Sequence, residues 1–378
     1  MRFLDGAVTA PQRRTELRVI EKIFARSLKS NFNKKSSFPF VTFVTFVTSV
    51  TLSDAAQIRR VQYLMGTVCE IEAHGSTQTE LEEALSAAFG EIARLEAMLS
   101  NWRGDSEISR FNHHPYRRPF ALSAELFEAL LSAQRQSELT GGAFDVTVEP
   151  LTVLWDLRGA GRVPRPQEIA RALRSVGHGR MILDETRRTA TFTRARMGVD
   201  LGGIGKGYAL DRAAIVLKEK GIHNALLNFG GQILALGSPP GAKAWRVRVA
   251  DPFDSRRAAV ETFLSNQSLA TSSQKERELV SGGRRVGHII DPKTGRPVEM
   301  EGSVTVVAAS ASEADALSTA LLVMGPGKGI QWLERNRQVS AFYLIKEANG
   351  QDLKISASRH YPVERLLRLA DNITFTRR

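Results

Sequence analysis

A glycine-rich segment, Asp200–Asp211, contains the residues of this chain that most clearly suggest chemistry. It reads Asp-Leu-Gly-Gly-Ile-Gly-Lys-Gly-Tyr-Ala-Leu-Asp, follows a strand-like run over Met197–Asp200 and leads into a helical pattern over Ala209–Lys220. Glycine lets backbone N–H groups approach a ligand closely, and the N-terminus of a helix adds positive potential. The segment therefore predicts an anion site, most simply for phosphate. Tight packing of a strand against a helix is the alternative, because neither the P-loop nor the G-x-G-x-x-G spacing is present.

A carboxylate and a hydroxyl four residues apart form a second candidate site. Ser303–Ala308 has the pattern of a strand, and Ser310–Glu313 has the spacing of a capping box, which predicts that a helix begins there. Asp315 and Thr319 would then share one face of that helix. Such hard oxygen ligands suit Mg²⁺, and a neighbouring phosphate site would favour the ion because their charges compensate each other. The alternative is an ordinary carboxylate at a helix start and a threonine bonded to its own helix.

His288 opens a third candidate site. The sequence His-Ile-Ile-Asp-Pro-Lys-Thr-Gly predicts a strand over His288–Ile290 that enters a turn at Asp291–Gly295. A histidine beside a phosphate site can act as an acid or a base near neutral pH. The alternative is that His288 is a half-buried strand residue and that Asp291 serves only the turn.

Two upstream segments are candidate walls of a ligand site. Leu99–Asn112 places Trp102 and several polar residues after a helix, and Thr140–Leu151 ends another helix with glycines. The residues that this second segment is expected to expose are Phe144, Asp145 and Thr147. Trp102 and Phe144 could stack on a flat heterocycle, each contributing about 0.5–1.5 kcal/mol beyond the area that it buries. Core packing is the alternative for both rings.

The composition is that of a globular protein and gives no support to a nucleic-acid partner. The chain has 378 residues, enough for one large domain or two ordinary ones, and a net charge of +12. Residues 1–60 hold a net charge of +7, which leaves +5 for the other 318 residues. These contain no long basic stripe, so we expect no nucleic-acid binding. Cys69 is the single cysteine, which excludes an internal disulfide and a cysteine-based zinc site.

Residues 1–59 are interpreted as a basic leader. Its apolar region, 38–55, follows two lysines and ends at small residues that suit signal-peptide cleavage, but it is too short for a comfortable membrane span. This interpretation predicts export to the periplasm, or association with the periplasmic face of the inner membrane. A threonine-rich β segment, a disordered leader and a start codon placed too far upstream are alternatives, and they leave a cytoplasmic location open.

The remaining pattern predicts one folded domain over 60–365 and a basic tail over 366–378. Expected helices are Thr77–Leu99, Ser123–Thr140 and Glu168–Val176, with two more beginning near Ala311 and Gly329. Expected strands are Val61–Ala73, Met181–Leu183, Thr189–Thr193, Ala225–Phe229, Trp245–Val249, Ala258–Phe263, His288–Ile290 and Ser303–Ala308. Because these elements do not alternate regularly, the predicted fold class is α+β.

Together, the motifs resemble one family, the FAD:protein FMN transferases of the ApbE type. The resemblance covers roughly residues 60–345, and its motifs occur in the family's order. They are Met65–Thr67, Ser100–Ser109, Gly142–Thr147, Asp200–Tyr208, Asn228–Gly231, Ala270–Ser273, His288–Gly295 and Ala314–Thr319. Each motif is weak alone, whereas the ordered set is highly specific.

The resemblance implies a T-fold-like α+β core of mixed sheets with packed helices. It also implies Mg²⁺-dependent transfer of FMN from FAD onto a Thr or Ser hydroxyl of an acceptor flavoprotein, with release of AMP. The implied metal ligands are Asp315, Thr319 and the carbonyl of Gly205, where many relatives have alanine, and the implied base is His288. The positions expected to line the FAD site are Met65, Trp102, Ala143, Phe144, Asp145, Asp200, Gly203, Lys206 and Ile289.

Two other functions stay open at this stage. With water in place of the acceptor hydroxyl, the same site would be a Mg²⁺-dependent FAD pyrophosphatase that gives FMN and AMP. A non-catalytic flavin-binding protein is the other alternative, although His288, Asp315 and Thr319 together argue against it. The acceptor would bring the enzyme close to a membrane, whereas the absence of a cysteine near the cleavage site departs from the lipoprotein members of the family.

Overall fold

The computed structural model describes residues 56–276, 278–281, 284–347, 352–362, 366–370 and 373–377. Residues 1–55 of the expected leader, including its apolar region 38–55, lie outside the described residues, so their role in export stays a prediction. Within the described ranges, no helix combines the length and hydrophobicity that a membrane-spanning helix requires.

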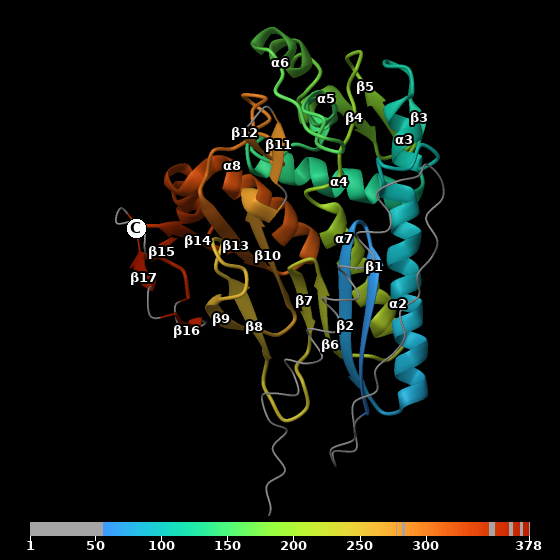
Figure 1. Ribbon diagram of the computed structural model, residues 1–378. Helices are drawn as coiled ribbons and strands as arrows, with labels where there is room; N and C mark the ends of the chain where they lie inside the picture. Colours follow the sequence, from blue (N-terminus) through green and yellow to red (C-terminus); the bar gives the residue numbers. More distant parts are fainter. Residues whose placement is uncertain are drawn as a thin grey trace, which may run out of the picture. The chain divides into compact units, whose positions relative to one another are not determined.

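A nine-stranded mixed sheet is the centre of the described fold (Figure 1). In spatial order, its strands are β1 (Ala56–Leu64), β2 (Thr67–Gly75), β6 (Asn224–Phe229), β7 (Gln232–Leu236), β10 (Gln267–Ser273), β13 (Gly302–Ala308), β14 (Ser340–Lys346), β15 (Leu353–Ala357) and β17 (Ile373–Arg377). Adjacent strands of this sheet run antiparallel, except that β15 and β17 are parallel.

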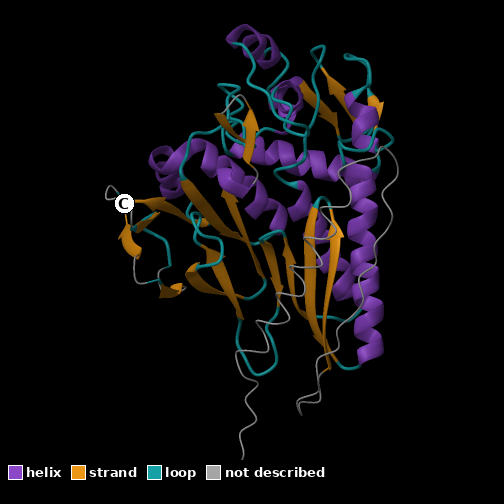
Figure 2. Cartoon of the chain, viewed as in Figure 1, coloured by secondary structure: helices purple, strands orange, loops and turns teal. Residues whose placement is uncertain are grey.

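Smaller sheets and helices surround this sheet (Figure 2). The smaller sheets are β16 (Leu366–Leu369) with β9 (Ala258–Leu264) and β8 (Trp245–Ala250), β3 (Phe120–Ala121) with β5 (Thr189–Phe192) and β4 (Met181–Asp184), and β11 (Glu278–Ser281) with β12 (Arg284–Gly287). The α-helices are α2 (Gln78–Leu99), α3 (Glu107–Asn112), α4 (Ala124–Leu139), α5 (Glu149–Leu154), α6 (Pro166–Leu173), α7 (Gly205–Glu219) and α8 (Ala311–Arg335), and the 3₁₀ helices are η1 (Val146–Val148), η2 (His178–Arg180) and η3 (Gln274–Glu276). The predicted α+β class is confirmed.

Successive residues of a strand point to opposite faces of the sheet. On the middle strands, both faces are covered by apolar clusters. On β10, Leu269 packs into an apolar cluster shared with β8 and β9, whereas Ala270 packs into a cluster shared with α8. At the other end of the sheet, α2 runs along the β1–β2 hairpin (Figure 1), and its buried face joins that of α7 in the largest core cluster. The main sheet therefore holds α7 and α8 on one side, and these two helices carry the three predicted metal ligands, Gly205, Asp315 and Thr319.

Several expected elements differ from the structure. The strand-like run over Met197–Asp200 forms no strand, and the helix expected near Gly329 is the last part of α8, beyond a kink at Gly325. The single strand expected over Val61–Ala73 is a hairpin, because Met65 and Gly66 have φ values of 45° and 77° and make a two-residue turn. The strand expected over His288–Ile290 is wrong, since β12 ends at Gly287 and Ile290 forms only an isolated bridge. The basic tail expected over 366–378 instead contributes β16 and β17, which pair with β9 and β15.

Helices α7 and α8 cross at Gly207, where there is no space for a side chain. A Cβ atom on Gly207 would lie 2.2 Å from the carbonyl oxygen of Ala311 and 2.7 Å from the Cα of Ser312. Close to this crossing, the Asp211 carboxylate accepts hydrogen bonds from the N–H groups of Ala311 and Ser312, at 2.7 and 2.9 Å. The carboxylate thereby caps α8, so the second turn of α7 is fixed to the first turn of α8.

We expect Gly207→Ala to destabilise the fold by about 1–3 kcal/mol, because the added methyl meets backbone that cannot move aside. This loss should exceed the roughly 1 kcal/mol that alanine gains over glycine as a helix former. Gly90, inside α2, is the matched control, since a Cβ atom there would meet nothing within 4 Å. Urea unfolding should show a lower midpoint for Gly207→Ala and an equal or higher one for Gly90→Ala. Equal midpoints for the two variants would contradict the steric argument.

Candidate functional site

The glycine-rich segment forms a turn that runs straight into α7. The Asp200 carboxylate accepts a hydrogen bond from the Gly202 N–H at 2.9 Å, and the Gly205 N–H donates to the carbonyl of Leu201 at 2.7 Å. Helix α7 begins at Gly205, four residues earlier than the helical pattern in the sequence, because glycine gives no periodic signal. Its N-cap residue, Ile204, provides no side-chain hydrogen bond. The N-terminus of α7, where the predicted anion site lies, thus has no side-chain cap from its own N-cap residue.

Asp315 and Thr319 of α8 lie against this turn, as their spacing predicts. The Asp315 carboxylate accepts a hydrogen bond from the Gly207 N–H at 3.1 Å, and Asp315 is only 5 % exposed. A Cβ atom on Gly203 would lie 3.2 Å from the Thr319 hydroxyl oxygen. The two side chains therefore lie beside opposite ends of the Gly203–Gly207 stretch, which has Gly205 at its centre.

Burial raises the pKa of the Asp315 carboxyl above its usual range, whereas the Lys206 charge and the Gly207 N–H oppose that rise. A buried carboxylate of this kind is stabilised by a nearby cation. Asp315, Thr319 and the Gly205 carbonyl offer oxygen ligands of the type that Mg²⁺ prefers. Within the described ranges, no group of three or more His, Cys, Asp and Glu side chains could hold a metal ion. The candidate set of Asp315, Thr319 and the Gly205 carbonyl is not such a group, because it contains one carboxylate, one hydroxyl and one backbone carbonyl.

Phe144 also reaches the glycine turn, but as a buried residue. A Cβ atom on Gly203 would lie 3.2 Å from Phe144 Cε2, and Phe144 is 3 % exposed within the largest core cluster. The expected exposure of Phe144, Asp145 and Thr147 is wrong, since all three are buried. The reason is the end of α4, where the Thr140 hydroxyl accepts the Phe144 N–H at 3.2 Å and the chain turns inward. Trp102, in contrast, is 61 % exposed.

The Asp145 carboxylate is used inside the protein. It accepts hydrogen bonds from the Thr147 N–H at 2.8 Å, the Thr147 hydroxyl at 2.6 Å and the His178 N–H at 2.7 Å. The His178 ring lies 3.4 Å from the same carboxylate, and hydrogen bonding to Asp145 raises the pKa of His178. Asp145 thus fastens the segment that carries Ala143 and Phe144 to η2. His178 was not among the predicted site residues.

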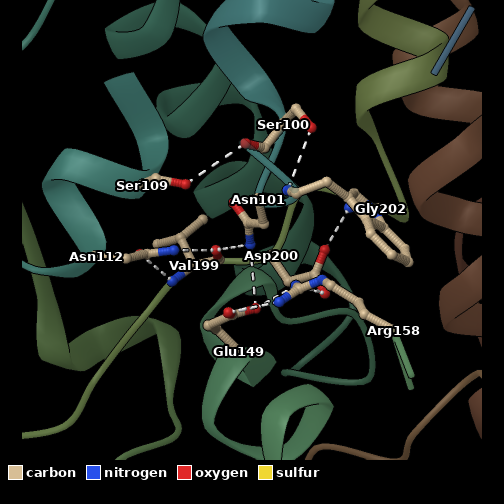
Figure 3. A network of polar contacts seen from close by, with 10 residues as sticks. Ser100, Asn101, Ser109, Asn112, Glu149, Arg158, Val199, Asp200 and Gly202 are labelled. Carbon is tan, nitrogen blue, oxygen red and sulfur yellow. Dashed lines mark hydrogen bonds and ion pairs between the residues drawn. The ribbon is translucent and has the colours of Figure 1, made fainter. Parts of the chain in front are cut away.

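A network of polar side chains supports the start of the glycine turn (Figure 3). Asn101 and Asn112 both donate to the carbonyl of Val199, at 2.7 and 2.8 Å, and the Val199 N–H donates back to Asn112 at 2.7 Å. Arg158 bridges the carboxylates of Asp200 and Glu149, with 2.8 Å to Asp200 Oδ2. The segment that carries Trp102 is thereby tied to the glycine turn through its neighbour Asn101.

Arg158 and Glu149 were also missed in the sequence. Burial raises the pKa of Glu149, against the opposing effect of the Arg158 guanidinium. No local sequence motif indicates these contacts, because Arg158 and Asp200 are 42 residues apart in the chain. Only folding brings the two together.

The His288 motif is held by Gln274, the residue after β10. The Gln274 side chain accepts the Ile289 N–H at 3.0 Å and donates to the Ile289 carbonyl at 2.7 Å. His288 itself is half-buried, and Ile289 packs against the apolar cluster of α8 and β13. The same strand reaches α8 directly, because the hydroxyls of Ser272 and Ser318 are 2.8 Å apart. Strand β10 thus links the His288 segment to the helix of Asp315 and Thr319.

Met65 lies at the tip of the β1–β2 hairpin, half-buried against the largest core cluster. Two of the family-like motifs meet here. The Gly230 N–H donates to the carbonyl of Val68 at 2.9 Å, and a Cβ atom on Gly230 would lie 2.8 Å from the side chain of Thr67. The hairpin motif is thus fixed to the turn between β6 and β7.

Comparison with known proteins agrees with the resemblance that the sequence motifs show. A family model described as the ApbE family matches residues 65–343. An FAD:protein FMN transferase of Haemophilus influenzae is 32 % identical over 292 residues, which is 75 % of this chain and 83 % of the relative. One of Vibrio cholerae is 34 % identical over 280 residues, covering 72 % of this chain and 80 % of the relative.

Solved structures agree with the sequence relatives. The flavin transferase ApbE from Vibrio cholerae matches with a TM-score of 0.72 and 31 % identity, over 81 % of this chain and 98 % of that structure. The apo form of the Pseudomonas stutzeri flavinyl transferase ApbE matches with a TM-score of 0.74 and 27 % identity, over 85 % of this chain and all of that structure (100 %).

Proposed function

The chain belongs to the ApbE family, and from this premise we propose how it transfers FMN from FAD to an acceptor protein. It is a transferase, as its curated relatives are, and it matches more than four fifths of the length of the Haemophilus relative. FAD consists of FMN and AMP joined through a diphosphate, so transfer of FMN releases AMP. The proposal concerns where the diphosphate lies, which residues act on it and whether Mg²⁺ takes part.

The observation that carries the proposal is the buried carboxylate of Asp315 beside the N-terminus of α7. One carboxylate, one hydroxyl and the N-terminus of a helix of 15 residues meet at the same glycine turn. The carboxylate suits a cation and the helix N-terminus suits an anion. A diphosphate with a divalent cation suits both features. A cation alone would suit only the carboxylate, and a diphosphate alone would suit only the helix N-terminus.

We infer that Asp315, Thr319 and the Gly205 carbonyl hold Mg²⁺. When bound, the ion neutralises diphosphate charge and makes phosphorus a better electrophile. The chain's own residues do the rest: the positive end of the α7 dipole and the Lys206 ammonium orient the diphosphate oxygens. The Phe144 ring, which lies against Gly203, and the exposed Trp102 ring are candidates for contact with the flavin or adenine ring.

We infer further that His288 is the general base for the incoming hydroxyl. The oxygen of an acceptor Thr or Ser forms a bond to the phosphorus on the FMN side. The bond from that phosphorus to the bridging oxygen breaks, and AMP leaves with that oxygen and the bond's electron pair. The hydroxyl proton passes to His288, so that the acceptor carries FMN as a phosphate ester.

The test is to incubate the protein with FAD and Mg²⁺, with and without a candidate acceptor flavoprotein subunit. We expect AMP to form mainly with the acceptor present, and the acceptor to gain the mass of FMN less water. An acceptor whose modified Thr is replaced by Val is the control and should gain nothing. AMP formed equally fast without an acceptor would identify an FAD pyrophosphatase instead. Bound FAD without any AMP would identify a non-catalytic flavin-binding protein.

A further inference from the structure

Gln274 is a buried polar residue to which the proposed reaction gives no role. It lies at the junction of β10 and η3 and is 7 % exposed. Its side-chain amide makes three hydrogen bonds to backbone groups of the His288 segment. The oxygen accepts the Ile289 N–H at 3.0 Å, and the nitrogen donates to the carbonyls of Ile289 and Val298 at 2.7 and 3.0 Å. One side chain therefore binds both backbone groups of the residue that follows His288.

The same amide also touches the residue that precedes His288. A Cβ atom on Gly287 would lie 2.2 Å from Gln274 Oε1, so the Gly287 backbone lies directly against the amide oxygen. Both chain neighbours of His288 thus contact one buried side chain. The backbone after the imidazole is consequently hydrogen-bonded to Gln274, and the backbone before it packs against Gln274, although His288 does not belong to a strand.

Gln274 is itself fixed to the helix of the proposed metal ligands. Two residues earlier, the Ser272 hydroxyl lies 2.8 Å from the Ser318 hydroxyl of α8, and Ser318 also donates to the carbonyl of Asp315 at 2.9 Å. The adjacent Ser273 hydroxyl donates to the Gly302 carbonyl at 2.9 Å, which holds the end of β10 to β13. A short path therefore runs from the Asp315 turn of α8 to the backbone around His288, through hydrogen bonds at both ends and the backbone of residues 272–274 between them.

We propose that Gln274 is a positioning residue for FMN transfer, which holds the His288 imidazole at a fixed place relative to Asp315 and Thr319. This inference rests on the proposed role of His288 as the base. Gln274 acts through the backbone of residues 287–289 and does not touch FAD or the acceptor. Removing it leaves the imidazole chemically intact but lets it move, which slows transfer and spares FAD binding.

The first test is the variant Gln274→Ala, assayed for acceptor modification with FAD as the donor. We expect kcat to fall by about 10- to 100-fold, as for loss of other supporting residues, with the KM for FAD unchanged. Gln274→Glu should behave like the alanine variant, because a carboxylate accepts the Ile289 N–H but cannot donate to the two carbonyls. Ser268→Ala is the matched control: it removes a buried side-chain hydrogen bond to the Ile233 carbonyl from the other end of β10.

The second test separates positioning from general loss of structure. If Gln274 acts only through His288, then Gln274→Ala should cause no further loss of residual activity in a His288→Ala background. Histidine-ring NMR gives a readout that needs no turnover, with the His288 signal assigned by its absence in His288→Ala. That signal should shift and broaden in Gln274→Ala and stay unchanged in Ser268→Ala.

Several results would overturn the inference. The first is an unchanged kcat in Gln274→Ala. The second is a loss of activity on adding Gln274→Ala that is as large in the His288→Ala background as in the wild type. The third is an unperturbed His288 signal in Gln274→Ala. A lower melting temperature with unchanged kcat would show that Gln274 supports only the fold. If the wild-type protein transfers no FMN, the proposed function fails instead, and the NMR comparison still decides whether Gln274 holds the His288 ring.

Discussion

Replacing His288 by alanine should abolish FMN transfer and leave FAD bound. A positioned general base contributes about 10²- to 10⁴-fold to the rate, and nothing in the variant replaces the imidazole. FAD affinity should be unchanged, because the proposed contacts to the diphosphate come from the glycine turn and α8. The measurements are the initial rate of acceptor modification by intact mass and the dissociation constant of FAD by flavin fluorescence.

His360→Ala is the control for this experiment, since it removes a partly exposed histidine whose ring lies 3.3 Å from the carboxylate of Glu334. Its rate should match the wild type. Should His288→Ala modify the acceptor as fast as this control, the assignment of the base would be wrong. If the rate and FAD binding fall together, His288 would belong to the FAD site.

Asp315→Asn should raise the Mg²⁺ concentration needed for half-maximal activity by at least about tenfold. The amide keeps the shape of the side chain and can still accept the Gly207 N–H, so the variant removes mainly one negative charge. A tenfold weaker site corresponds to about 1.4 kcal/mol. One charge pair at about 4 Å contributes roughly 1–4 kcal/mol between bulk water and a protein surface. Titration of activity against Mg²⁺ measures the effect, and the rise in melting temperature on adding Mg²⁺ measures it without turnover.

Glu313→Gln is the matched control, because Glu313 is a half-buried carboxylate in the first turn of the same helix. Its Mg²⁺ requirement should stay that of the wild type. Equal requirements in Asp315→Asn and Glu313→Gln would remove Asp315 from the proposed ligand set. A loss of activity that no Mg²⁺ concentration restores would instead point to a role of Asp315 in ordering the turn.

The part of the site that local spacing determines could be predicted from the sequence. Ser310 begins α8 as expected, with its hydroxyl 3.2 Å from the Glu313 N–H, and this start fixes Asp315 and Thr319 on one face. The turn that leads into α7 needed only the run of glycines before a helix. In both cases the information lies within a few neighbouring residues.

The β1–β2 hairpin does not show in the apolar pattern of the sequence, because Val61, Tyr63, Cys69 and Ile71 all occupy odd positions, as in one continuous strand. In one continuous strand, buried residues keep the same parity, because the side-chain period is two. Here Ile58 and Leu64 are buried at even positions, whereas Cys69 and Ile71 are buried at odd positions. The change of parity lies at Met65–Gly66, where the turn occurs.

Other features could not be predicted from local patterns. The inward turn that buries Phe144 and Asp145 depends on one threonine hydroxyl at the end of α4. Gln274 directly follows a recognised motif, yet its partner Ile289 lies 15 residues further along the chain. Such contacts arise from the tertiary fold, and a single sequence carries no periodicity that reports them.

The parallel pairing of β15 with β17 affects how the chain can be shortened. A variant that ends at residue 365, where composition suggests that a tail begins, would lose the outermost strand of the main sheet. The backbone of β15 would then present unpaired N–H and C=O groups to solvent, a template on which other chains can assemble. Poor solubility of such a truncation would thus result from the exposed edge strand β15 and not from damage to the flavin site.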